Sequence, residues 1–109
     1  MMKIENTEAQ MRKGVLEYCI LSILSQGEAY TSDILQNLKD AKLIVVEGTI
    51  YPLLNRLRKG KLLTYRWEES SSGPPRKYYS LTPEGEKFLS QLEVSWNELN
   101  EAVHQITKK

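Results

Sequence analysis

The stretch that decides the fold is EGTIYPLLNRLRKG, residues 47–60. Its large apolar residues recur at helical spacing and share one side of a helix: Ile50, Leu53, Leu54 and Leu57. Pro52 comes just past the first turn, where few carbonyl groups precede it, so the helix can accommodate it. A glycine at position 60 is a typical helix stop. We predict one amphipathic helix over residues 47–59.

The outward side of this helix is suited to a nucleic acid. It presents small, amide and cationic residues: Gly48, Pro52, Asn55 and Lys59, flanked by Tyr51 and Arg56. No acidic residue occurs from Gly48 to Trp67, whereas five cations do. From Glu84 to Glu101 the bias reverses, with five glutamates and one lysine. Taken alone, residues 47–59 could equally form an ordinary amphipathic helix with a solvated face. The neighbouring elements therefore decide between this interpretation and a nucleic-acid-binding helix.

Alternating residues after the helix predict a β-hairpin. Leu63, Tyr65 and Trp67 share one face of a first strand. A second strand over residues 76–81 places Tyr79 toward the core and Tyr78 on the opposite face. Residues 70–75, SSSGPP, are expected to form a longer loop. The hairpin carries a basic rim that continues that of the helix: Arg66, Arg76 and Lys77.

Two helices are predicted upstream. The first runs from about Met11 to Gly27, on the apolar pattern of Leu16, Cys19, Ile20, Ile23 and Leu24, with residues 1–8 loosely ordered. The second is capped by the residues at 31–33 and ends near Lys42. Residues 43–46, LIVV, are expected to be extended.

A long final helix is predicted from Pro83 to about Thr107, with Thr82 as its N-cap. Its apolar residues follow a heptad seam: Leu89, Leu92, Trp96, Leu99, Val103 and Ile106. An amphipathic helix that projects beyond a hairpin needs a cover, which a symmetric partner supplies. The seam therefore favours a homodimer.

Three helices followed by a hairpin describe a winged helix-turn-helix, a mainly α fold with a small β-hairpin (α+β). In this arrangement the third helix enters the major groove of DNA. We expect residues 1–82 to form the DNA-binding domain and residues 83–109 a dimerisation helix, within one compact unit.

Other classes of function find little support in the sequence. The single cysteine, Cys19, permits no intrachain disulfide or thiolate cluster, and Cys19 and His104 leave few groups for catalysis. We expect no enzyme, cofactor or metal site. No run of about 20 apolar residues and no signal peptide is present, so we expect a cytoplasmic protein with no membrane contact. The alternative is a winged-helix module that binds protein, which the basic band from Arg56 to Lys77 disfavours.

Several segments resemble the PadR family of bacterial transcriptional regulators, in particular its short members with a single C-terminal helix, similar to multidrug-responsive PadR-like repressors. The segments are RKGVLEYCILSIL (12–24), GTIYPLLNRLRKGKLL (48–63), Trp67, GPPRKYYSLTPEG (73–85) and Trp96, which together span nearly the whole chain. YTSDI (30–34) and Arg58, where many members have an acid, are mild departures. The resemblance implies a dimeric repressor, released by a small molecule or another signal, whose final helix packs with the partner's first helix.

These arguments give three sets of candidate residues. The DNA-binding set is Thr49, Tyr51, Pro52, Asn55, Arg56, Lys59, Arg76 and Lys77, acting on a double-stranded operator with an inverted repeat. Tyr51 has an alternative, packing beside the first strand. The dimerisation set is Leu16 with the seam of the final helix. The resemblance further implies a planar aromatic effector that stacks near Trp96, beside Leu92 and Leu99. The alternative is that Trp96 only packs the dimer core.

Overall fold

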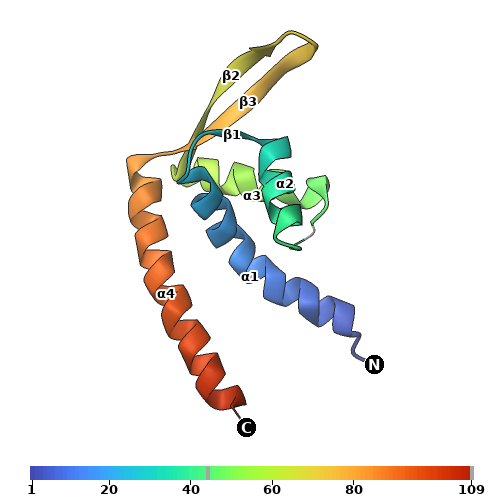
Figure 1. Cartoon of the computed structure of the whole chain (residues 1–109), viewed down its shortest axis with the longest axis vertical. Helices are drawn as coiled ribbons and strands as arrows, with labels where there is room; N and C mark the ends of the chain where they lie inside the picture. Colours follow the sequence, from blue (N-terminus) through green and yellow to red (C-terminus); the bar gives the residue numbers. More distant parts are fainter. Residues whose placement is uncertain (44, 109) are drawn as a thin grey trace.

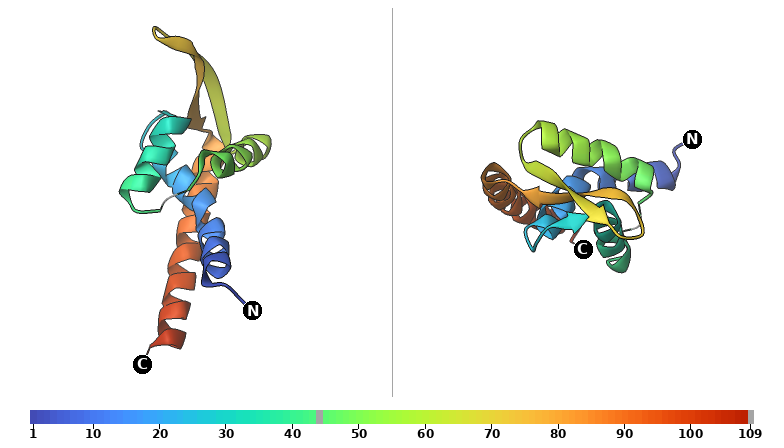
Figure 2. Two further views of the ribbon diagram at one scale, coloured as in Figure 1. Left: turned by 90° about the vertical axis from the view of Figure 1, so that its right-hand side faces the viewer. Right: turned by 90° about the horizontal axis from the view of Figure 1, so that it is seen from above.

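The computed structural model describes residues 1–43 and 45–108. Its elements are α1 (Ile4–Leu24), β1 (Ala29–Tyr30), α2 (Thr31–Asp40), α3 (Glu47–Lys59), β2 (Leu63–Ser70), β3 (Gly73–Leu81) and α4 (Pro83–Thr107). The predicted α+β class is confirmed. α1, α2 and α3 form a body, from which the β2–β3 hairpin, here called the wing, and α4 extend in opposite directions (Figure 1). Seen from above, α2 and α3 lie on either side of the wing base (Figure 2).

A single hydrophobic core joins the three helices to the base of the wing. Its fully buried members come from α1, α2, α3 and β2: Ile20, Leu21, Ile34, Ile50, Leu54 and Leu63. Tyr79 of β3 is also buried, as the strand alternation predicted. Leu16, predicted at a dimer interface, instead lies in this core with 3% of its surface exposed. Its side chain is already covered within the protomer, so little of its surface is left for the predicted contact with a partner.

α1 is longer than its apolar pattern predicted. It begins at Ile4 rather than near Met11, and residues 1–8 are therefore mostly helical. Residues 4–10 contain no proline or glycine and include good helix formers, glutamate, alanine and glutamine. Almost all of this first part is exposed, so it has no apolar stripe from which its start could be predicted.

The sheet has three antiparallel strands in the order β1-β3-β2, one more than the predicted hairpin. β1 pairs Ala29 with Tyr79 and Tyr30 with Tyr78, while Leu63 of β2 pairs with Leu81. The predicted loop at 70–75 is wrong, because the strands continue to Ser70 and from Gly73. Pro74 and Pro75 fit within β3 because its pairing with β2 is irregular there and β1 reaches only positions 78 and 79.

The bounds of α2 and α3 agree closely with the sequence pattern. Asp33 of α2 caps the helix by accepting the backbone N–H of Tyr30 at 3.0 Å. α3 ends at Lys59 as predicted, but the left-handed residue is Lys61 (φ 65°) and not Gly60 (φ −76°). The Leu62 N–H donates to the Leu57 carbonyl at 3.0 Å, which closes the helix end. The expected extended piece at 43–46 includes residue 44, which lies outside the described residues.

The start of α4 is fixed to the turn between α3 and β2. The Thr82 hydroxyl accepts the Gly85 N–H at 2.9 Å, as predicted for the N-cap, and donates to the Lys61 carbonyl at 2.7 Å. Gly85 is buried against Leu62. This junction holds the first turn of α4 against the body, and Leu89 and Leu92 of the following turns also pack against the core. Neither α4 nor any other helix in the described part of the chain is long and apolar enough to cross a bilayer.

Candidate nucleic-acid interface

α3 presents one exposed side, and the candidates predicted on it all lie there. All six are exposed to solvent: Thr49, Tyr51, Pro52, Asn55, Arg56 and Lys59. The helix can expose them because Ile50, Leu54 and Leu57 anchor its other side in the core. The face therefore combines hydroxyl, amide and cationic groups along one ridge.

The wing meets α2 and α3 across a cleft of about 460 Å³, here called the wing cleft. Its lining is Tyr30, Thr31, Ser32, Glu47, Tyr51, Trp67, Pro75, Arg76, Lys77 and Tyr79. The cleft brings the predicted wing cations, Arg76 and Lys77, opposite the start of α3. Sequence reasoning missed Thr31 and Ser32, because only the pairing of β1 with β3 brings α2 beside the wing. It also did not include Glu47 of α3 among the candidates.

Aromatic rings hold the two wing cations in place. The Arg76 guanidinium lies 5.4 Å from the ring centre of Tyr30, and the Lys77 ammonium lies 4.5 Å from that of Tyr65 and 5.6 Å from that of Trp67. Such contacts favour a cation by about 0.5–1 kcal/mol at exposed sites. They reduce side-chain freedom while leaving the N–H donors available to an anion. Trp67 itself is 61% exposed, an unusual position for this side chain.

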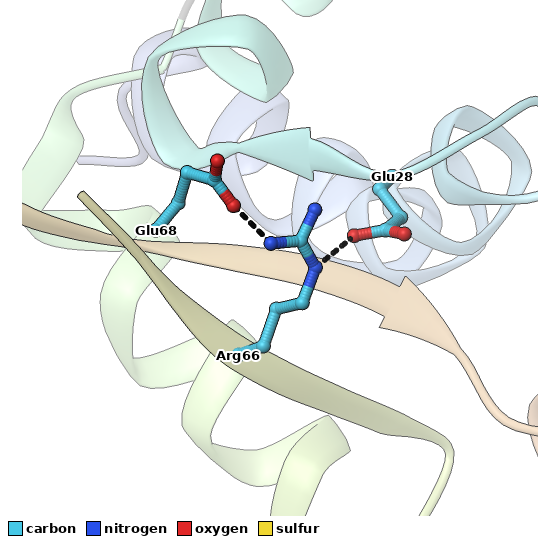
Figure 3. A network of polar contacts seen from close by, with 3 residues as sticks. All are labelled: Glu28, Arg66 and Glu68. Carbon is cyan, nitrogen blue, oxygen red and sulfur yellow. Dashed lines mark hydrogen bonds and ion pairs between the residues drawn. The ribbon is translucent and has the colours of Figure 1, made fainter. Parts of the chain in front are cut away.

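Arg66, which we predicted to belong to the basic rim, serves a different purpose. Its Nε donates to Glu28 Oε2 at 3.0 Å, and its Nη1 donates to Glu68 Oε2 (Figure 3). The guanidinium also lies 4.8 Å from the ring centre of Tyr78. Two carboxylates balance its charge, so Arg66 ties the wing to the segment before β1. No local sequence pattern predicted this contact, because Glu28 and Arg66 lie 38 positions apart.

Two further polar contacts occupy α3 side chains. Arg56 Nη1 forms an ion pair with Glu17 Oε1 of α1. Arg58 Nη2 donates to Asn55 Oδ1 at 3.1 Å. To accept a hydrogen bond from an adenine edge, Asn55 Oδ1 would have to lose or share the hydrogen bond that Arg58 donates to it. Arg56 remains largely exposed and can approach a phosphate from the side away from Glu17.

Tyr51 has a defined partner at the start of α3. Its hydroxyl donates to Glu47 Oε1 at 2.8 Å, and this hydrogen bond, followed by desolvation, raises the pKa of the Tyr51 phenol. The ring is 48% exposed and lines the wing cleft. This position leaves the Tyr51 ring accessible to a bound partner.

α4 carries the predicted apolar seam, with its two halves in different surroundings. Leu89 and Leu92 pack against the core, whereas Leu99, Val103 and Ile106 are 58%, 48% and 83% exposed. Trp96, at the boundary, is 38% exposed, and its ring centre lies 6.4 Å from that of Tyr18 in α1. Phe88, which the heptad pattern omitted, is 40% exposed beside Leu92.

The single cysteine, Cys19, lies in α1 and does not line the wing cleft. Cys19 packs beside the core, and burial raises the pKa of its thiol. Residues 1–43 and 45–108 contain no group of three histidine, cysteine, aspartate or glutamate side chains placed to hold a metal ion. The polar groups that do converge are those of α3 and the wing cleft.

Comparison with known proteins identifies the fold. Residues 20–91, more than half of the chain, match the transcriptional regulator PadR-like family. A PadR-like transcription factor from Bacteroides fragilis is 62% identical, with 94% of this chain and 99% of that one covered and a TM-score of 0.79. A PadR-like transcriptional regulator from Bacillus cereus is 42% identical over 92% and 98% of the two chains, also with a TM-score of 0.79.

The structure of Bacillus subtilis PadR in complex with operator DNA is also similar. It is 29% identical, with a TM-score of 0.68, over 73% of this chain and 47% of that longer one. The family consists of transcriptional regulators and not of enzymes. The winged-helix architecture, the family match and these similarities together show that the chain belongs to the PadR-like family of transcriptional regulators.

Proposed function

We propose that the protein binds a double-stranded operator with an inverted repeat, as a homodimer that represses transcription in the cytoplasm. The observation that carries the proposal is that the start of α3 shares one cleft with Arg76 and Lys77 of the wing, while the other candidates of α3 are exposed along the same helix. α3 would place Thr49, Pro52 and Asn55 against base edges in the major groove. Arg56, Lys59 and the wing cations would contact phosphates, which position the protein without reading sequence.

The relative from Bacillus subtilis, whose structure holds operator DNA, supports duplex DNA as the partner. The alternative of a protein-binding module would leave the exposed cations of α3 and the wing without a partner of opposite charge. Neutralising phosphates is the simplest use of such a surface.

Enrichment of binding sequences from random duplex DNA, followed by affinity measurements at several salt concentrations, tests the proposal. We expect an enriched inverted repeat and an affinity that falls steeply with salt, because each phosphate contact releases counterions. Lys77→Ala should weaken binding to all sequences and reduce the slope of log K against log salt by about 1. Lys108→Ala at the far end of α4 removes the same charge away from the cleft and should change neither quantity. Salt-independent binding, or none, would contradict the proposal.

The homodimer is inferred from α4, whose distal half is held by no other element in the described part of the chain. Its exposed seam continues directly from Leu92 and Trp96, which touch α1 of the same protomer. A symmetric partner would cover this seam, and residues 83–108 would then serve as a dimerisation helix attached to a DNA-binding unit.

We also propose release by a planar aromatic effector that stacks on Trp96 beside Leu92 and Leu99. Trp96 and Tyr18 offer two aromatic faces, and the Trp96 ring retains exposed surface. Titration of flat aromatic compounds should quench the Trp96 fluorescence and weaken operator binding. The variant Trp67→Phe removes the competing signal. If quenching persists unchanged in Trp96→Ala, the compound binds elsewhere and Trp96 only packs the interface.

A further inference from the structure

Glu47 is a carboxylate in a surface otherwise built to attract DNA. It is the only acidic residue from Ala41 to Trp67 and the first residue of α3. Its side chain is exposed and lines the wing cleft together with Arg76 and Lys77. A carboxylate at this place repels the phosphates that the wing cations attract, so it weakens binding unless the complex gives it a partner.

The Glu47 carboxylate accepts a hydrogen bond from its own helix. The Tyr51 hydroxyl donates to Oε1 at 2.8 Å, and the described residues provide no second hydrogen-bond donor to this carboxylate. An acid in the first turn stabilises a helix through the macrodipole wherever its side chain points. A neighbouring hydroxyl that orients it toward the cleft is not needed for that effect. The second oxygen, Oε2, therefore remains free to accept a hydrogen bond from a bound partner.

The partners available in a DNA groove are few. Residues at the N-terminal end of a recognition helix are those that contact base edges. In the major groove, amino hydrogens are presented by cytosine N4 and adenine N6, and glutamate pairs with cytosine N4. A sequence without an amino group at this position would leave the carboxylate desolvated and facing acceptors or phosphates, which costs binding energy.

We propose that Glu47 is a specificity-determining residue, which accepts an amino hydrogen from a base, principally cytosine N4, and penalises duplexes that do not present one. The inference rests on the proposed DNA-binding function. Tyr51 acts as its positioning residue, because its hydroxyl fixes the carboxylate.

The test compares the full-length wild type with Glu47→Gln. Both proteins are used to enrich sequences from random duplex DNA, and their dissociation constants are then measured for the wild-type site and for random duplex at one salt concentration. We expect Glu47→Gln to bind random duplex more tightly while its preference for the wild-type site falls by roughly tenfold. A cytosine preference at one position of each half-site should disappear. Tyr51→Phe should lower the same preference by a smaller factor.

Glu84→Gln is the matched control, because it removes an exposed carboxylate from the first turn of α4, away from the wing cleft. It should leave the specificity ratio unchanged. If Glu47→Gln strengthens binding to both duplexes by the same factor, or enriches the same sequences as the wild type, Glu47 reads no base and the inference is overturned. If the wild type enriches no sequence, the proposed function fails and the inference fails with it.

Discussion

Gly85 is the residue at which the long helix α4 meets the body of the protein. A Cβ atom at this position would lie 2.1 Å from the Leu62 carbonyl oxygen and 2.7 Å from Leu81 Cδ2. The first contact is with backbone, which cannot rotate away. We predict that Gly85→Ala lowers the free energy of unfolding by about 1–3 kcal/mol, the usual cost of overpacking. Urea denaturation followed by circular dichroism measures the change.

Gly14 in α1 is the matched control for this prediction. Its Cβ position has no heavy atom within 4 Å, so Gly14→Ala should keep or raise the stability, by up to about 1 kcal/mol through helix propensity. Equal effects of the two substitutions would contradict the packing argument. The sequence predicts Thr82 as the N-cap of α4. It cannot show that Leu62 lies against Gly85, because only tertiary folding brings these two residues together.

Glu17 limits the availability of an arginine on the candidate DNA face. Its carboxylate pairs with Arg56 of α3, and the Arg56 side chain is 73% exposed. Exposed pairs of this kind contribute about 0–1 kcal/mol to stability, so Glu17→Gln should fold normally. It should bind duplex DNA more tightly and show a steeper salt dependence, because Arg56 then pairs only with phosphate. Fluorescence anisotropy at several salt concentrations checks this, with Glu5→Gln as the control for removal of a negative charge from α1. Unchanged affinity would mean that Arg56 does not reach the DNA.

At the scale of elements, the bounds of a helix were predicted best where apolar residues at helical spacing also pack against the rest of the protein. The bounds of α3 follow from its buried stripe, and those of α4 from its N-cap and its seam. The start of α1 could not be predicted, because its exposed first turns have no stripe to mark them. β1 could not be predicted either, since two residues carry no alternation and form a strand only through pairing with Tyr78 and Tyr79.

The wing differs from its prediction for a related reason. By itself, SSSGPP predicts a loop, because proline has no backbone N–H to donate to a neighbouring strand. In the structure, Pro74 and Pro75 lie in the strand because the described residues place no neighbour on the outer edge of β3 there. Likewise, the charge of Arg66 placed it in the predicted basic rim, whereas in the structure Glu28 and Glu68 lie beside it. Of the candidate site, the residue types were predictable and their partners were not.

The wing can be tested as an element through Trp67, which is exposed beside Lys77. In Trp96→Phe, Trp67 is the sole tryptophan. We predict that saturating duplex DNA quenches and shifts its emission, because the wing side of the cleft moves from water to the DNA backbone. Lys77→Ala in the same background should reduce the change by weakening that approach. An emission unaffected by DNA, while anisotropy reports binding, would show that this face of the wing stays in water.

The whole molecule is elongated, 55 × 34 × 23 Å, because the wing and α4 extend in opposite directions (Figure 1). The charge follows the same axis, with the cations of α3 and the wing at one end and the glutamates of α4 toward the other. A duplex bound at the wing end is therefore kept away from the acidic helix. The net charge of +1 conceals this separation, and the local charge balance along the sequence reveals it.

The same shape places the proposed dimer interface at the far end of the molecule. Leu99 lies in the exposed half of the α4 seam and contributes nothing to the core of the protomer. Leu99→Glu should therefore leave the fold intact while burying a charge in any interface that covers the seam. We predict a dimer dissociation constant raised by roughly a hundredfold or more, measured by sedimentation equilibrium.

Gln105→Glu adds the same charge on the opposite side of α4 and should leave the dimer unchanged. The consequence for DNA follows from symmetry. A monomer retains one α3 and one wing, so Leu99→Glu should bind a single half-site as the wild-type protomer does but lose the added affinity for two half-sites one helical turn apart. If Leu99→Glu still sediments as a dimer, the seam of α4 is not the interface. If it is monomeric yet binds the full repeat as tightly as the wild type, dimerisation does not contribute to operator recognition.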